Sequence, residues 1–458
     1  MKDFQLHVPP GYPRNFAPAT QELDIGALPV DGAVPRGLRG TLLRNGPNPR
    51  TPQAAAHWFA GDGMLHAFRF DGGRVSYRNR WIRTPRWCAP AGAASSAEGG
   101  SVANTNVLVH AGQLLALEEA HLPLRLDGLA ADGPVGPPDF AASLAGPFTA
   151  HPKIDPATGD MIFFGYGVPD AWSPGMSYGS LDAAGRVTRF ERFCAPYASM
   201  VHDFAVTAQH VLFPVLPLAA SAARAAAGGP TFAWEPHRGG YVGILRRDRG
   251  VESLAWRAVP PCFVFHVMNA WDDGRRIEVD VMQSDVPALF TWPDGSAIDG
   301  DSDAYLARWT IDLDAAAPCH SQEFLCDIPG EFPRIDDRFA GSAHRHAWFV
   351  GDGAQGQPFA CLVHIDHHEG RLDVHHLPAG DCASEGVFVP RAGHAGEGEG
   401  WLLSVVYRGR ADRSDLLVFD AQALGAGPVA CVRMPCRIPN GLHGNWVDAA
   451  AGAAWHAW

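Results

Sequence analysis

The chain has 458 residues, of which 47% are hydrophobic and 19% are charged, and its formal net charge at pH 7 is −13. This composition is that of an ordinary folded protein with enough apolar residues for a large core. The chain is acidic and contains no run of lysine and arginine, whereas proteins that bind nucleic acid usually carry a basic patch or stripe. We therefore expect no nucleic-acid partner.

The beginning of the sequence, residues 1–10, has no apolar core of the kind that a secretory signal needs. The nine cysteines include no Cys-x-x-Cys pair and indicate reduced thiols in a reducing compartment. We therefore expect a cytoplasmic protein. The longest apolar stretch, residues 211–223, contains Pro214 and Pro217 and is too short to span a bilayer. It could still make peripheral contact with a membrane surface.

Along the chain, short runs of β-branched and aromatic residues alternate with glycine-containing turns, which predicts an all-β fold. Residues 64–70 and 74–81 flank Asp-Gly-Gly and predict a hairpin, and residues 348–350 run into another turn, Gly-Asp-Gly. Helical periodicity is confined to residues 141–144 and 216–227. No clean repeat and no linker divides the sequence, so we predict a single domain over residues 1–458, a degenerate β-propeller with long loops.

Four histidines lie in short segments of apolar, small or aromatic residues: His151, His202, His266 and His443. Such surroundings predict buried imidazoles, and buried polar groups need partners. The histidines are too far apart in sequence for a local metal loop, but a closed, radially repeated β-structure could bring all four to one point. A core histidine satisfied by hydrogen bonds is the alternative for each.

Three glutamates, Glu119, Glu331 and Glu385, lie in equally apolar segments, and a carboxylate commonly orients a metal-bound histidine through its second ring nitrogen. An all-nitrogen set of ligands suits iron, copper, nickel or zinc. A structural zinc site is the competing interpretation, although such sites nearly always include cysteine. The histidine-rich segments at residues 344–346, 364–368 and 375–376 are expected on solvated faces.

At these residues the chain resembles the carotenoid cleavage oxygenases, non-haem Fe(II) enzymes that split carbon–carbon double bonds of carotenoids, apocarotenoids and aryl-alkenes. The resemblance extends over nearly the whole sequence. Its motifs lie at residues 38–49 (LRGTLLRNGPNP), 57–66, 103–106, 149–153, 331–337, 413–417 and 441–446 (GLHGNW).

The resemblance implies a seven-bladed β-propeller with an iron site on its axis, capped by loops and short helices that enclose an apolar tunnel. The iron ligands implied are His151, His202, His266 and His443. The carboxylates of Glu119, Glu331 and Glu385 are implied to orient His202, His266 and His443, respectively, which leaves His151 without a carboxylate. Thr105 would lie near a coordination position of the iron and leave another open for O2.

The function implied is an Fe(2+)-dependent dioxygenase that uses O2 to cleave a C=C bond of a conjugated alkene into two carbonyl products. The amino-acid sequences of these motifs resemble those of a bacterial branch of the family that cleaves stilbenes and isoeugenol-type phenylpropanoids. That branch typically has a lysine where this chain has Glu118, and a tyrosine in the preceding loop, which residues 89–100 lack. These differences favour apocarotenoids or other apolar polyenes as substrates.

Two further functions compete with this one. A non-oxidative relative, an isomerase or isomerohydrolase, would use the same iron site without incorporating oxygen. The second is a β-propeller that serves as a binding platform and in which the metal has only a structural role. Such a protein would not need the three glutamates. The sequence does not fix an oligomeric state.

Overall fold

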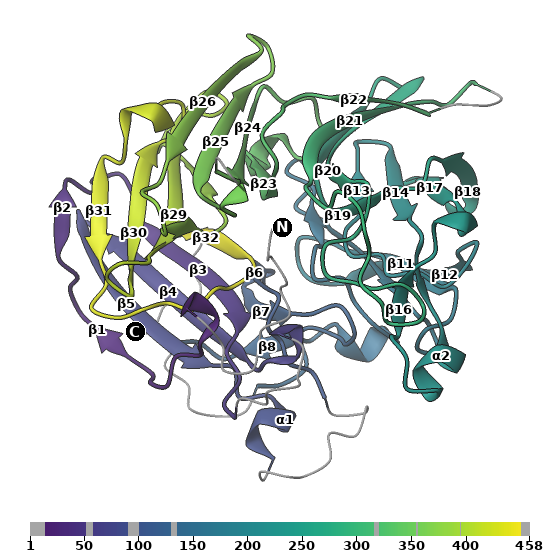
Figure 1. Cartoon of the computed structure of the whole chain (residues 1–458), viewed down its shortest axis with the longest axis horizontal. Helices are drawn as coiled ribbons and strands as arrows, with labels where there is room; N and C mark the ends of the chain where they lie inside the picture. Colours follow the sequence, from purple (N-terminus) through teal and green to yellow (C-terminus); the bar gives the residue numbers. More distant parts are fainter. Residues whose placement is uncertain are drawn as a thin grey trace. The chain divides into compact units, whose positions relative to one another are not determined.

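The computed structural model describes residues 14–51, 58–89, 100–129, 135–315, 320–353, 356–393 and 395–449. By its internal contacts the chain divides into two compact units, one formed by residues 1–141 and 345–458 and the other by residues 142–344. Strands dominate the described part of both units (Figure 1).

The first unit contains four antiparallel sheets among its described residues. One sheet has the order β1 (Asp24–Ile25), β5 (Arg74–Trp81), β4 (Gly63–Asp71), β3 (Gly40–Pro47), β32 (Gly444–Asp448). A second has β6 (Asn106–His110), β7 (Gln113–Leu117) and β8 (Leu124–Leu126). A third has β2 (Val30–Gly32), β31 (Ala430–Arg433), β30 (Arg413–Asp420), β29 (Gly400–Arg408), β27 (Cys382–Ala383), with β28 (Val387–Pro390) also paired to β29. The fourth includes β24 (His346–Gly351), β25 (Cys361–Asp366) and β26 (Arg371–His376).

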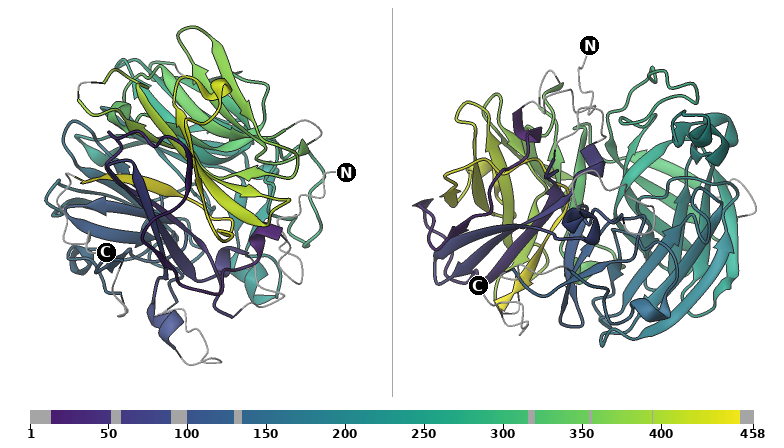
Figure 2. Two further views of the ribbon diagram at one scale, coloured as in Figure 1. Left: turned by 90° about the vertical axis from the view of Figure 1, so that its left-hand side faces the viewer. Right: turned by 90° about the horizontal axis from the view of Figure 1, so that it is seen from below.

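The two ends of the described chain meet in this first unit. Strand β32 pairs with β3, from Gly40 opposite Asp448 to Arg44 opposite Gly444, and β2 pairs with β31. The purple and yellow strands that lie side by side in Figures 1 and 2 are these pairs. Each of these pairs lies within a different sheet. An apolar core packs between the two sheets, with Phe68 and Tyr77 from one sheet and Leu416 from the other.

The second unit contains three four-stranded antiparallel sheets and one two-stranded sheet among its described residues. The first is β12 (Val187–Cys194), β11 (Gly175–Leu181), β10 (Met161–Tyr166), β9 (Lys153–Ile154). The second is β13 (Ala205–Val206), β14 (His210–Val215), β17 (Gly240–Arg246), β18 (Gly250–Val259). The third is β19 (Phe263–Asp272), β20 (Arg276–Ser284), β21 (Tyr305–Asp312), β22 (His320–Phe324). The pair is β15 (Leu218–Ala220) with β16 (Phe232–Trp234), and β23 (Gly330–Ile335) packs against β19.

Helices are short throughout the described residues. The α-helices are α1 (Pro85–Cys88) and α2 (Ala222–Ala226), and the 3-10 turns are Arg14–Phe16, Trp58–Ala60, Ala141–Ser143, Pro236–Arg238, Asp337–Phe339 and Leu424–Ala426. No helix in this part of the chain has both the length and the apolar character required to cross a bilayer.

The hairpin predicted around Asp-Gly-Gly is confirmed as β4 and β5, which pair from Met64 with Trp81 to Asp71 with Arg74. Its turn uses Gly72 and Gly73, with φ of 59° and 90°. Two successive positive φ values suit the twist of a tight hairpin, and glycine adopts them without steric cost.

The helix predicted over residues 216–227 is shorter than expected. Ser221 caps α2 by accepting a hydrogen bond from the Arg224 N–H at 3.1 Å, and the residues before it form β15 instead. Tertiary pairing with β16 overrides helical propensity there. Within the apolar stretch of residues 211–223, residues 211–219 are all buried, whereas Ala222 and Ala223 are exposed.

Candidate metal centre

Three of the four predicted histidines come together inside the second unit. His151 lies two residues before β9, His202 lies three residues before β13, and His266 lies within β19. Their ring centroids are 4.5 to 5.2 Å apart and each pair of rings meets edge-on. His151 and His266 are buried, and His202 is partly buried.

Two of these rings direct the same nitrogen at each other. The Nε2 atoms of His151 and His202 are 3.0 Å apart. Two nitrogens bound to one ion at about 2.1 Å and at right angles are about 3.0 Å apart. The pair therefore has the spacing of neighbouring ligands on a single ion.

The strand that carries His266 is irregular at that residue. The pairing of β19 with β20 changes register between Val264 and Val267 and again between Val267 and Asn269. Bulges of this kind redirect a side chain out of the regular alternation and are common beside active sites. The irregularity thus accounts for how a residue in the middle of a long strand reaches the histidine cluster.

Glu331 binds the His266 ring at its Nδ1 atom. Its Oε2 lies 2.6 Å from His266 Nδ1 and also accepts the Phe332 N–H at 2.9 Å. A carboxylate at Nδ1 favours the tautomer protonated there, and the lone pair then lies on Nε2. This is the pairing that the resemblance implied for Glu331.

Phe332 adopts an unusual backbone conformation next to this carboxylate. Its φ is 59°, a value that is uncommon for a bulky residue and that concentrates at functional sites. Its ring stacks on His266 with centroids 5.6 Å apart, and Phe265 contacts His202 edge-on at 5.5 Å. The sequence analysis did not identify either aromatic residue, although both lie directly beside residues that it did identify.

The fourth histidine, His443, lies in the first unit with its own carboxylate. His443 Nδ1 is 3.0 Å from Glu385 Oε1, and Glu385 Oε2 accepts the Gly444 N–H at 2.7 Å. Both side chains are buried. The arrangement repeats that of His266 and Glu331, because one carboxylate again binds the imidazole and an adjacent backbone amide.

The backbone around His443 is fixed from two sides. The Asn45 N–H donates to the His443 carbonyl at 2.9 Å, and the His443 N–H donates to the Thr105 carbonyl at 3.1 Å. Close packing adds to this restraint, because a Cβ on Gly46 would lie 2.4 Å from Gly441 Cα. Buried Thr105 is therefore adjacent to His443 through the main chain.

A buried cation lies near this pair. Arg44 is 5% exposed, and its Nη1 donates to the Pro439 carbonyl at 3.0 Å. Burial lowers the pKa of Arg44 to about 10, an effect that the charge of Glu385 partly opposes. Arg44 therefore remains charged at neutral pH.

His151, His202 and His266 of the second unit belong to a group of histidines that could hold a metal ion, and His443 of the first unit is the fourth predicted ligand. All four donors are imidazole nitrogens, which suits a first-row transition metal rather than Mg²⁺ or Ca²⁺. Glu119 lies two residues after β7 and is partly buried. Its implied pairing with His202 stays a prediction.

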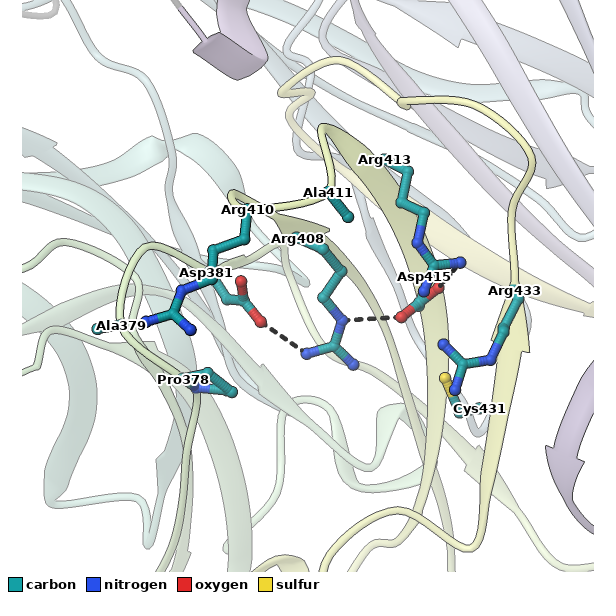
Figure 3. A pocket seen from close by; sticks show the side chains of 10 residues that line it. All are labelled: Pro378, Ala379, Asp381, Arg408, Arg410, Ala411, Arg413, Asp415, Cys431 and Arg433. Atoms are coloured by element: carbon teal, nitrogen blue, oxygen red, sulfur yellow. Dashed lines mark hydrogen bonds and ion pairs between the residues drawn. The ribbon is translucent and has the colours of Figure 1, made fainter.

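Two cavities lie elsewhere in the described residues, and neither is lined by a predicted site residue. The one drawn in Figure 3 has a volume of about 340 Å³ and contains four arginines. Carboxylates already neutralise much of this charge, since Arg408 binds Asp381 at 2.9 Å and Asp415 at 2.8 Å, and Arg433 pairs with Asp31. We therefore assign this cavity to a structural ion-pair network.

One expectation about other histidines is wrong. His344, His346 and His364 are buried, with exposed fractions of 8%, 5% and 1%, whereas the sequence placed them on solvated faces. Strands β24 and β25 are buried along their whole length, and His346 Nδ1 lies 3.0 Å from His364 Nε2. Trp348 stacks on His364, so these residues belong to the core.

Comparison with known proteins identifies the family. Residues 16–448 match the family model described as Retinal pigment epithelial membrane protein. The chain is 36% identical to isoeugenol monooxygenase of Pseudomonas nitroreducens, over 94% of this chain and 96% of the relative. It is 34% identical to a carotenoid cleavage oxygenase of Mycobacterium tuberculosis, with the same shares covered. The chain belongs to this family of carotenoid cleavage oxygenases.

The fold agrees with that membership. The crystal structure of Pseudomonas brassicacearum lignostilbene dioxygenase superimposes with a TM-score of 0.90 and 31% identity, covering 96% of this chain and 98% of the other. The carotenoid cleavage oxygenase described here is accordingly a seven-bladed β-propeller, as predicted, and nearly all β. Because its relatives are oxygenases that cleave alkene C=C bonds, the chain is an enzyme of this class.

Proposed function

We propose that the chain is a non-haem Fe(II)-dependent dioxygenase in which His151, His202, His266 and His443 bind the iron. The observation that carries this proposal is the 3.0 Å approach of the His151 and His202 Nε2 atoms, because it matches the spacing of two ligands on one ion. The carboxylates at His266 and His443 add support, since they bind Nδ1 in both cases.

In this proposal the glutamates determine which ring nitrogen each histidine offers. Glu331 and Glu385 accept the Nδ1 protons of His266 and His443, so that Nε2 remains an unprotonated donor. We extend the same role to Glu119 toward His202, as the family resemblance implies. The carboxylates also offset the charge of a divalent ion without occupying its coordination positions, which leaves room for O2.

Bound iron would activate O2, and the alkene itself would supply the electrons that reduce it, since both carbons of the cleaved C=C bond are oxidised to carbonyls. The chain itself contributes orientation and exclusion of water. The rings of Phe265 and Phe332 lie against His202 and His266 and offer an apolar environment beside them. Thr105, adjacent to His443, is our candidate for the residue near the open coordination position.

Within the alkenes, we propose an apolar conjugated substrate rather than a phenolate. Glu118, which stands where the stilbene-cleaving branch typically has lysine, is 9% exposed. Its Oε2 accepts the Ala120 N–H at 3.1 Å, and its Oε1 binds His121 Nδ1. Both oxygens are thus engaged within the protein, and a buried carboxylate would repel a substrate anion.

The proposal also includes predictions about the domain organisation, the location of the protein and its partners. Residues 1–458 form one domain, with loops and short helices capping an apolar tunnel to an axial iron. The protein acts in the cytoplasm. Its partners are O2 and the alkene, and any peripheral membrane contact does not involve the buried stretch of residues 211–219.

The test is aerobic turnover of the Fe(II)-loaded protein on apocarotenals, hydroxystilbenes and isoeugenol, with aldehyde products identified by mass. The wild type is compared with His202→Ala and with His376→Ala, a control in which an exposed histidine is lost. We expect cleavage by the wild type and the control, together with loss of bound iron and activity in His202→Ala.

Equal iron content and turnover in His202→Ala would contradict the ligand assignment. Iron bound by the wild type without cleavage of any substrate, but with isomerisation of a polyene, would instead support the non-oxidative alternative.

A further inference from the structure

A single buried carboxylate connects the three histidine segments of the second unit. Asp203 follows His202 directly and is 3% exposed. Its Oδ1 lies 2.7 Å from the Lys153 ammonium, and Lys153 is the second residue after His151. Its Oδ2 accepts the N–H of Val267, the residue after His266, at 2.8 Å. One side chain therefore reaches all three ligand-bearing segments.

The contact with Val267 coincides with the irregular part of β19. Val267 lies between the two register changes in the pairing of this strand with β20. Asp203 thus binds the backbone amide next to the bulged residue His266. In a regular β-ladder the His266 side chain would not point to the metal site. The carboxylate supports the local geometry on which the position of the His266 ring depends.

The energetics favour a tightly held Asp203. An isolated buried carboxylate is costly, whereas one that is paired with a cation and accepts several N–H bonds is well stabilised. Asp203 Oδ1 also accepts the Phe204 N–H at 2.8 Å, and the Lys153 ammonium lies 5.8 Å from the Phe204 ring centre. The Lys153 side chain is 28% exposed, against 2% for that of Asp203.

We propose that the Lys153–Asp203 pair is a positioning element that sets the mutual spacing of His151, His202 and His266. This inference rests on the proposed function, because it assigns the pair to the geometry of the metal site. Neither residue is a ligand in this view. Loss of the ammonium leaves an uncompensated buried charge that draws the β13 segment away from β9, and the ligand nitrogens separate.

The experiment compares Lys153→Met and Asp203→Asn with Lys153→Arg and the double variant. The probe is Co(II) alone, added to metal-free full-length protein. The readouts are the Co(II) dissociation constant, the visible ligand-field spectrum of the bound ion, and the melting temperature without metal. A role confined to folding would lower the melting temperature and leave the spectrum of the loaded protein unchanged.

We expect Lys153→Met and Asp203→Asn each to weaken Co(II) binding about 10- to 100-fold, the range typical for residues that orient ligands, and to change the spectrum. The double variant should bind no more weakly than the worse single variant, because both substitutions break one interaction. Lys153→Arg should restore most of the affinity, since the guanidinium can also pair with the carboxylate.

Arg408→Met is the matched control, because Arg408 pairs at 2.8 Å with a buried carboxylate, that of Asp415, and its side chain is 20% exposed. It should lower stability and leave the Co(II) spectrum unchanged. If Asp203→Asn does not fold, the comparison of Lys153→Met with Lys153→Arg decides the question, since Lys153 is partly exposed.

An unchanged Co(II) affinity and spectrum in Lys153→Met would overturn the inference while leaving the proposed function intact. If wild type bound no Co(II), or if His202→Ala bound it equally well, the proposed function itself would fail, and this inference with it. The two failures are therefore distinguishable.

Discussion

The Glu385 carboxylate fixes the His443 ring and the following residue together, through Nδ1 at 3.0 Å and the Gly444 N–H at 2.7 Å. Glu331 makes the same two kinds of contact with His266 and Phe332. Each glutamate thus restrains the rotation of an imidazole and the local path of the main chain. Two such restraints in separate parts of the chain argue that ring orientation matters at the proposed site.

We expect Glu385→Gln to weaken metal binding about 10- to 100-fold. In Glu385 the two contacts use different oxygens, Oε1 for His443 Nδ1 and Oε2 for the Gly444 N–H. In glutamine one of these positions carries an NH2 group, which donates hydrogen bonds and cannot accept one. The measurement is competition with a chelator of known affinity. Glu323→Gln, a substitution on the exposed face of β22, should bind metal like the wild type. Equal affinity in the two variants would refute the role of the carboxylate.

Gly46→Ala should destabilise the protein and weaken metal binding, because its Cβ would lie 2.4 Å from Gly441 Cα in the segment that leads to His443. Overpacking of this kind typically costs about 1–3 kcal/mol. Thermal unfolding and metal titration test both effects. At exposed Gly37 an added Cβ meets nothing within 4 Å, so Gly37→Ala should be neutral or slightly stabilising.

Glu118→Lys should raise activity on 4-hydroxystilbenes relative to apocarotenals, provided that this position faces the substrate. The substitution replaces a carboxylate with a cation able to pair with a phenolate. It also removes the acceptor of the Ala120 N–H and the partner of His121, which should cost about 1–3 kcal/mol of stability. The ratio of turnover on the two substrates is decisive, and an unchanged ratio would place Glu118 outside the substrate site.

Stability should fall as the pH decreases below 6.5. Burial, with the nearby charge of His346, lowers the pKa of His364 from 6.5 to about 3. Between these values the unfolded chain binds a proton that the folded protein excludes, so the free energy of unfolding decreases by up to about 1.4 kcal/mol per pH unit. Below about pH 3 this contribution levels off.

Denaturant unfolding at several pH values tests this expectation. His364→Gln should show a shallower decline between pH 6.5 and about 3, whereas His376→Gln, at an exposed position, should follow the wild type. A wild-type curve as shallow as that of His364→Gln would contradict the prediction.

Much of the fold could be predicted from short patterns. The alternation in residues 74–81 and the adjacent Gly-Gly turn define a hairpin without reference to the rest of the chain. The number of blades came only from the family resemblance, because the blades differ in sequence. The helix predicted at residues 216–227 was too long, since the pairing of β15 with β16 is a tertiary effect that local propensity does not reveal.

The limits at the site have a similar cause. Apolar flanks identified His266 and Glu331, and the structure brings these two together. The same reasoning misassigned His364, because its polar neighbours in sequence do not reveal that β25 is buried along its whole length. Asp203 was missed for a different reason. Its contacts with Lys153 and Val267 join residues distant in sequence, and no local pattern encodes them.

The pairing of β32 with β3 has a consequence for how the enzyme matures. His443 immediately precedes β32, which joins a sheet whose other strands all lie before residue 82. A nascent chain can form those earlier hairpins long before the last strand leaves the ribosome, but it holds only three of the four proposed ligands until then. Iron incorporation would therefore be completed only once β32 has been synthesised and paired with β3, and a bound iron would indicate that this sheet has closed.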